Sequence, residues 1–388
     1  MVKRSLTSAI RPLANLRTSA VPVRHFSASP ARGLSAIFHE TENAELNKTL
    51  NEIQEKIILP AYLPPKQRQL VFNAKMRNFI QQNPVIIELD GLEHKFTTIN
   101  PFKDIPNSKK IFSSALTQMK TREDWENLGT LLAGYKKAGI RLYPEYYARV
   151  IRMAGKNNQI YSIIECAKKV QRTGLALNRK DYVALLLSGI NNKIIQSGGE
   201  KAESLQAGKW AELVLDLIQR PEHMLGNASP LHRLHFNPAI RGLVLFTQGS
   251  LAKAQQAAAE PTADTEQSLR ENVELIVNAW NRFGTDNLAE SPVLADLNPL
   301  PFLTRKTTKL TANGGYVSPN HYISALAQNI RGMELAQEFL GDSAKDLKPI
   351  QDKLEQHLQQ FVKDVPNYRE GWGQTYESIT GRKPNWSV

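Results

Sequence analysis

The sequence predicts an all-α protein, a helix-pair α-solenoid with one small N-terminal β-hairpin. From Pro106 almost to the C-terminus, apolar residues recur three or four positions apart in segments separated by short turns, which is the pattern of amphipathic helices. Two stretches of this region align at an offset of 35 residues. A repeat of that length is typical of solenoids, in which each helix pair buries its apolar face by stacking on its neighbours.

The N-terminal segment has the composition of a mitochondrial presequence. The first 39 residues contain no Asp or Glu but many Arg, Lys and Ser residues, and "RHFSASPA" from Arg24 resembles a matrix-processing site. We assign residues 1–33 to the presequence, with a disordered basic tail as the alternative. Removing this segment takes away six basic side chains and lowers the net charge from +12 to +6, which is moderate for a nucleic-acid-binding protein.

The mature chain is expected in the mitochondrial matrix, either soluble or peripheral to the inner membrane. Its apolar runs are shorter than the roughly 18 residues that a membrane span needs. Cys166 is the only cysteine, so disulfide scaffolds and cysteine-based zinc sites are excluded, and we expect Cys166 to be a small buried apolar residue.

Residues 34–105 are predicted to form N-terminal helices and the β-hairpin. A first helix ends at Pro60, and a second follows through "PKQRQLVFNAKMRNFIQQ". The stretch "VIIELDGLEHKFTTI" then alternates apolar and polar residues around Asp90-Gly91, a dipeptide suited to a two-residue hairpin turn. We expect the hairpin to pack against the first helices rather than to bind a ligand.

Residues 106–285 are predicted to form the helical repeat region. A Gly- and Ser-containing stretch from Lys193 to Gly208 is expected to be a flexible loop. Two longer helices then complete the region. The earlier helices are predicted at 109–119, 122–138, 144–156, 160–173, 179–193 and 207–220.

The last two segments are a connector and a C-terminal helical region. The connector, 286–320, is rich in Pro and Gly and is expected to lie across the surface. Residues 321–388 are expected to be helical again, with an aromatic and basic tail, "NYREGWGQTYESITGRKPNW", from Asn367 to Trp386. That tail would either dock on RNA or on a protein groove, or cap the solenoid.

The repeat resembles a known family. At the 35-residue offset Gly139 aligns with Gly174 and Tyr147 with Tyr182, giving motif starts at 109, 144 and 179. The stretch "EYYARVIRMAGKNNQIYSIIECAKKVQRTGLALN" resembles a pentatricopeptide repeat (PPR), with an early aromatic, a polar turn and a second helix that ends in a basic-x-Gly-apolar turn. Tetratricopeptide repeats (TPR) are the competing family, but their 34-residue period and Trp-Leu-Gly-Tyr pattern fit less well.

The resemblance implies a superhelix whose first helices hold single-stranded RNA, one base per motif. In the family, the residue after the early aromatic and the last residue of the motif read the base. Those positions are Ser113 with Tyr143, Ala148 with Asn178, and Val183. Ser113 and Asn178 have side chains suited to this role.

Basic residues on the first helices are the other candidates for contact with RNA. Arg149, Arg152 and Lys156 are three and four positions apart and therefore share one helical face. The alternative is that these residues form ordinary solvated faces. The predicted RNA-binding set is Lys109, Lys110, Ser113, Arg149, Arg152, Lys156, Asn178, Arg179, Lys180 and Lys193.

The sequence offers no support for catalysis, a metal or a cofactor. It contains no glycine-rich phosphate loop, no G-x-S-x-G elbow and no H-E-x-x-H motif. His232 and His235 lie without a nearby Cys or paired carboxylate. The carboxylates at 123, 124 and 126 begin a helix, where they interact favourably with its dipole.

Three functions remain open. The first is a non-enzymatic RNA-binding protein that acts on messenger or ribosomal RNA in organellar gene expression: processing, stability or translation. The second is a structural or assembly component of the mitochondrial ribosome, held by ribosomal proteins and by RNA phosphates. The third is a TPR-like assembly factor for a respiratory complex.

Overall fold

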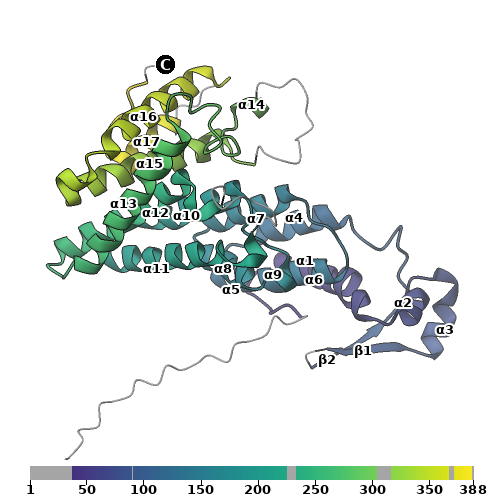
Figure 1. The fold of residues 1–388 in the computed structure, drawn as a ribbon. Helices are drawn as coiled ribbons and strands as arrows, with labels where there is room; N and C mark the ends of the chain where they lie inside the picture. The colour runs from purple at the N-terminus through teal and green to yellow at the C-terminus, as the bar shows by residue number, and fades with distance from the viewer. Residues whose placement is uncertain (1–36, 90, 225–232, 304–315, 367–370, 387–388) are drawn as a thin grey trace, which may run out of the picture. The chain divides into compact units, whose positions relative to one another are not determined.

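Helices make up most of the described structure, as predicted for an all-α protein. The computed structural model describes residues 37–89, 91–224, 233–303, 316–366 and 371–386 (Figure 1). Within these residues the strands form one two-stranded sheet. The segment assigned to the presequence, 1–33, lies outside the described residues.

The N-terminal elements are α1 (Ala44–Ile53), a π-helical turn (Gln54–Ile58), α2 (Pro65–Val71), α3 (Arg77–Gln82), β1 (Val85–Leu89) and β2 (Leu92–Phe96). The first part of the repeat region, up to residue 220, holds α4 (Ser108–Gln118), α5 (Arg122–Glu126), α6 (Leu128–Lys137), α7 (Pro144–Lys156), α8 (Ile160–Lys168), α9 (Val170–Thr173), α10 (Lys180–Gln196) and α11 (Lys201–Leu217). The remaining helices are α12 (Pro238–Ala257), α13 (Ala263–Phe283), α14 (Leu300–Leu303), α15 (Pro319–Leu340), α16 (Leu347–Asp364) and α17 (Gly371–Thr380).

The hairpin packs against the first helices, as the sequence predicted. β1 and β2 are antiparallel with Val85 opposite Phe96, and Gly91 at the turn has φ +83°. The inward side chains of the hairpin close a small core with η2 (Leu59–Tyr62), α2 and α3. The buried members of this core are Leu59, Leu63, Val71, Ile80, Val85, Phe96 and Ile99.

The repeat region consists of stacked helix pairs. The first helices α4, α7 and α10 contact one another in order, and the row continues through α12 to α15. The second helices α6, α8 and α11 also contact in order, and Figure 1 shows the two rows one above the other. The stacking is that of a solenoid, because each pair buries its apolar face on the next.

The 35-residue offset reflects the turn between successive pairs. Gly139 and Gly174 follow α6 and α9, with φ of +71° and +75°. A left-handed residue at this position ends a helix, and glycine adopts it without steric cost. Leu142 and Leu177 follow three residues later, and both are buried. The repeat in the sequence therefore records a repeated turn and a repeated packing position.

The loop predicted from Lys193 to Gly208 is wrong in its extent. α10 continues to Gln196 and α11 begins at Lys201, so only residues 197–200 form the turn. Gly198 and Gly199 supply its positive φ angles. The small residues Ser204 and Ala207 of this stretch lie on the buried face of α11. Close helix packing, rather than flexibility, explains them.

The prediction that the connector lies across the surface is also wrong for its described part. Leu294 and Leu297 are buried at 0% and 3% exposure and belong to the main core, and Tyr316 joins the same cluster. The helical period is absent here because prolines interrupt the segment, so the apolar residues gave no pattern that indicated burial. The positions 304–315 lie outside the described residues.

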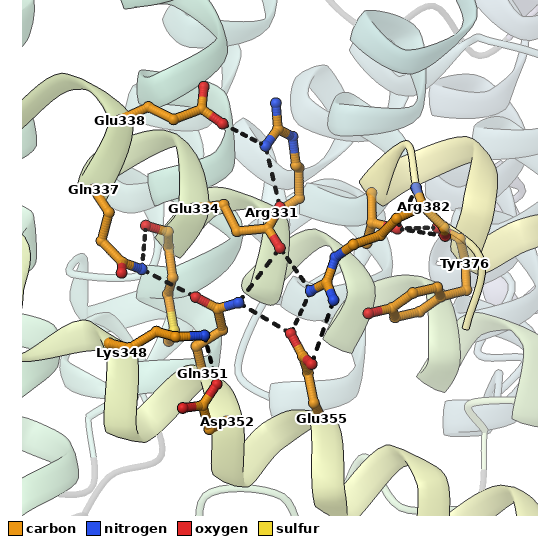
Figure 2. Close-up of polar contacts among 12 residues, drawn as sticks. Arg331, Glu334, Gln337, Glu338, Lys348, Gln351, Asp352, Glu355, Tyr376 and Arg382 are labelled. Atoms are coloured by element: carbon orange, nitrogen blue, oxygen red, sulfur yellow. Dashed lines mark hydrogen bonds and ion pairs between the residues drawn. The ribbon is translucent and has the colours of Figure 1, made fainter. Parts of the chain in front are cut away.

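The C-terminal tail caps the row of helices. Trp372 and Tyr376 of α17, and Trp386 beyond it, are buried. α17 packs on α15, and Arg382 just after it forms ion pairs with Glu334 of α15 and Glu355 of α16 (Figure 2). Of the two roles predicted for the tail, the described residues take the capping role.

Candidate nucleic-acid interface

The basic residues predicted on α7 lie along one side of the helix but differ in their surroundings. Arg149 extends toward α4, with its Nη2 3.4 Å from the Thr117 hydroxyl. Arg152 donates from Nη1 to the backbone carbonyl of Tyr316 in the connector. Burial, and secondarily the charge of Arg149, lowers the pKa of Arg152. Lys156, at the end of the helix, is exposed.

The start of α4 adds a second basic group around an exposed aromatic ring. Lys109 Nζ lies 4.0 Å from the centre of the Tyr143 ring, and the Arg141 guanidinium lies 5.9 Å from it. Tyr143 is 45% exposed, and Lys110 beside Lys109 is exposed as well. A ring flanked by two cations suits both stacking on a base and binding of its phosphate.

The α4 and α7 groups belong to one face. The two helices contact each other, and the Asn157 side chain after α7 donates to the Met119 carbonyl after α4 over 3.2 Å. The helices therefore run side by side in the same direction, with Lys109 near one end, Arg149 in the middle and Lys156 at the other end. We call the surface formed by Lys109, Lys110, Ser113, Tyr143, Arg149 and Lys156 the α4–α7 face.

The basic residues predicted on the third motif are paired within the chain. Arg179 forms an ion pair with the buried Asp181 over 3.0 Å. Lys180 pairs with Asp296 of the connector over 3.3 Å and also donates to the Pro292 carbonyl. Burial lowers the pKa of Lys180, and Asp296 acts in the opposite direction. These contacts neutralise charge that the sequence assigned to RNA.

Lys193 follows the same pattern at the far end of α10. Its Nζ lies 2.6 Å from the Glu203 carboxylate and 5.3 Å from the centre of the Trp210 ring, both on α11. Residues 181–191 of α10 are all buried, since α7, α8, α11, α12 and α15 contact this helix. Helix α10, the first helix of the third motif, is therefore part of the core and does not form an open surface.

Two of the positions expected to read bases have packing roles. Ala148 and Val183 are both 0% exposed and sit in the main core. Tyr182, the early aromatic of the third motif, is 3% exposed and donates its hydroxyl to the Pro144 carbonyl over 2.8 Å. Ser113 and Asn178 are half-buried. Two of the three positions after the aromatics thus face other helices.

Other candidate residues have structural explanations. Asp124 Oδ2 accepts from the Lys120 and Thr121 amides over 2.9 and 3.0 Å, which completes a capping box at the start of α5. Cys166 is buried, as predicted, and burial raises the pKa of its thiol to about 12. His235 is buried too, whereas His232 lies outside the described residues. No cluster of three potential metal ligands occurs among the described residues.

None of the helices in the described ranges combines the length and apolar character needed to cross a bilayer. Stacked helix pairs, a cationic face on two first helices and a capped C-terminal end define the class: a helical-repeat protein with a basic surface.

Comparison with known proteins defines the family. The family model for mitochondrial ribosomal protein mS27 matches residues 24–380, which is most of the chain. A curated relative, small ribosomal subunit protein mS27 of Neurospora crassa, is 35% identical over 188 residues. This alignment covers 48% of each chain, so the chain spans about half the length of that relative. The chain belongs to the mitochondrial ribosomal protein mS27 family.

The assignment to the pentatricopeptide-repeat family is therefore wrong. The resemblance arose from the 35-residue spacing, from the early aromatics and from the glycine turn. The structure explains these features by packing: the aromatics contact neighbouring helices, and the glycines end the second helices. A similar spacing follows whenever helix pairs of similar length stack in series, whatever the protein binds.

Proposed function

We propose that this chain is a structural, non-enzymatic component of the small subunit of the mitochondrial ribosome, located in the matrix. The observation that carries the proposal is the family match over residues 24–380. The match favours this function over a transcript-specific RNA-binding factor and over an assembly factor for a respiratory complex. A ribosomal protein needs no base-reading code, in agreement with buried Ala148 and Val183.

We further propose that the α4–α7 face contacts ribosomal RNA phosphates. Among the described residues, no carboxylate lies within ion-pairing distance of Lys109, Lys110, Arg149 or Lys156. The cations on α10 are paired, so among the cations predicted to bind RNA, those without a carboxylate partner lie on the first two motifs. Binding of several phosphates by such cations releases counterions and makes the association salt-dependent.

The experiment is sedimentation of mitochondrial lysate from cells that express the tagged full chain. The tag is placed at the C-terminus, because an N-terminal tag would be lost with the presequence. Stoichiometric co-migration with the small subunit at high salt is the expected result. Migration in light fractions, or with a respiratory complex, would contradict the proposal.

A charge variant tests the face itself. Replacing Lys109, Lys110, Arg149 and Lys156 by Gln is expected to release the protein from the subunit at lower salt than wild type. The control replaces Lys345, Lys353 and Lys363 by Gln, since these exposed lysines lie in the C-terminal region. Equal salt resistance of the two variants would count against RNA contact by the α4–α7 face and leave the ribosomal location intact.

A further inference from the structure

A second basic surface lies on α2, α3 and the short helix η3 (Ala74–Met76) between them. The RNA-binding residues predicted from the sequence include none from this part of the chain. We call residues 64–83 the basic arm. It rests on the small core that α2, α3 and the hairpin share, and the Ile99 amide, just after β2, donates to the Val71 carbonyl over 2.9 Å. The arm is therefore a folded support for whatever its outer surface binds.

Helix α2 has little packing of its own. Residues 64–69 are all exposed, and Val71 in the last turn is the buried residue of this seven-residue helix. Helices this short are marginal in water without tertiary contacts. The side chains of residues 64–69 therefore do not contribute to the hydrophobic core, so packing does not explain their chemistry.

The charge of the arm has one sign. No Asp or Glu occurs between Glu55 and Glu88, while Lys66, Arg68, Lys75 and Arg77 are all exposed. Within the described part of the chain, none of these four side chains has a carboxylate in ion-pairing distance. Lys137 of α6 adds a neighbouring cation, with its Nζ 5.1 Å from the centre of the Tyr62 ring just before the arm.

Apart from Pro64, Pro65 and Ala74, the remaining exposed residues of the arm are hydrogen-bonding amides and one aromatic ring. Phe79 is 48% exposed, although it belongs to a helix whose Ile80 is buried in the small core. The exposed amides are Gln67, Gln69, Asn73, Asn78, Gln81, Gln82 and Asn83. Cations and amides bind phosphate and sugar oxygens, and an exposed ring stacks on an unpaired base.

We propose that the basic arm is an RNA-binding element, in which the four cations and the amides bind the phosphate backbone and Phe79 stacks on an unpaired base. An anionic membrane is a poorer match, because residues 66–69 of α2 present polar side chains instead of the exposed apolar face that an interfacial helix inserts. The proposal rests on the proposed function only for the identity of the RNA, which would be ribosomal.

The test measures binding of the purified full chain to a labelled transcript of the mitochondrial small-subunit ribosomal RNA over a range of salt. Replacing Lys66, Arg68, Lys75 and Arg77 by Gln is expected to weaken binding about tenfold or more at 0.1 M salt and to reduce the slope of log Kd against log salt by roughly 2 to 4. The control is the Lys345, Lys353 and Lys363 variant. Affinity and slope equal to the control would overturn the proposal.

Phe79 has its own matched control. Phe79→Ala is expected to weaken transcript binding about fivefold or more, whereas Phe102→Ala, at a ring that is 94% exposed outside the arm, leaves the affinity unchanged. Equal effects would overturn the stacking role. Unchanged thermal midpoints for all variants exclude unfolding as the cause.

Two further probes test other partners. Phosphatidylserine vesicles represent a membrane, and polyglutamate represents an acidic protein. If the arm substitutions abolish binding to either probe and leave transcript binding unchanged, the proposal is overturned. The binding assay uses the purified chain alone, whereas the gradient experiment reports on ribosome association. A negative result in the binding assay can therefore be distinguished from a negative result in the gradient experiment.

Discussion

The Arg382 guanidinium lies 2.6 Å from the Glu334 carboxylate and joins the last residues of the chain to α15. The same group also pairs with Glu355 of α16 and packs 5.9 Å from the centre of the Tyr376 ring (Figure 2). One cation thus connects three C-terminal helices. Hydrogen bonds and charge from Glu355, together with the charge of Glu334, raise the pKa of Arg382, so it remains protonated at every relevant pH.

Arg382→Ala is expected to lower the free energy of unfolding by about 1 to 2 kcal/mol, because two neighbouring carboxylates lose their shared cation. The expected loss of stability is modest because the Arg382 side chain is 39% exposed, and water screens its ion pairs. Chemical denaturation measures the loss, with Arg282→Ala on an exposed part of α13 as the control. A loss no larger than that of the control would show that aromatic burial alone holds the tail.

The crossing of α12 and α15 depends on Gly332. A Cβ at this position would lie 2.6 Å from the Phe246 backbone nitrogen and 3.0 Å from the Gly242 carbonyl oxygen. Because backbone atoms cannot move aside separately, Gly332→Ala is expected to cost about 2 kcal/mol. Gly371→Ala, where no heavy atom lies within 4 Å, is the control. Thermal denaturation of the two variants should therefore separate them clearly.

The stability of the fold is expected to depend on pH through His357. Its Nε2 lies 2.8 Å from the Tyr322 hydroxyl, and burial lowers its pKa to about 4, while the charge of Asp364 acts in the opposite direction. The unfolded chain takes up a proton near pH 6.5, but the folded chain does not until about pH 4. Stability is therefore full above pH 6.5 and declines as the pH falls toward 4.

The expected loss from His357 is at most roughly 1.4 kcal/mol per pH unit in this range. His321, whose pKa burial also lowers to about 4, contributes in the same direction. His357→Gln keeps an acceptor for Tyr322 and is expected to flatten the decline measured by denaturation between pH 7.5 and 4.5. An unchanged slope would rule out proton uptake at His357 as a source of acid instability.

Much of the fold was predictable from local signals. Periodic apolar residues placed the helices, and Gly139 and Gly174 marked the repeated turn. The burial of the connector was not predictable, because it depends on partners far away in the sequence, such as Lys180 with Asp296. The amide–hydroxyl network around the buried Asn191 shows the same limit, since it accepts from Thr247 of α12 over 2.6 Å and donates to Gln328 of α15 over 3.1 Å.

The candidate site was predictable only in part. The sequence identified the cations of α4 and α7, and the structure leaves Lys109, Lys110, Arg149 and Lys156 without carboxylate partners among the described residues. The sequence alone could not distinguish these cations from the paired cations of α10, because it does not show which basic side chains have a carboxylate partner in the folded protein. The basic arm had one detectable signal, the absence of acidic residues between Glu55 and Glu88.

Lys156 and Lys180 provide a direct test of that distinction, because the sequence assigned both to RNA. Lys156 is exposed at the end of α7, whereas the Lys180 side chain is 10% exposed and bound to the connector. Lys156→Met is expected to weaken binding to the ribosomal RNA transcript and to lower the salt slope by about 0.9. Lys180→Met is expected to leave both unchanged and to lower the free energy of unfolding by about 1 kcal/mol. The opposite result would mean that the connector moves away from α10 and exposes its cations to RNA.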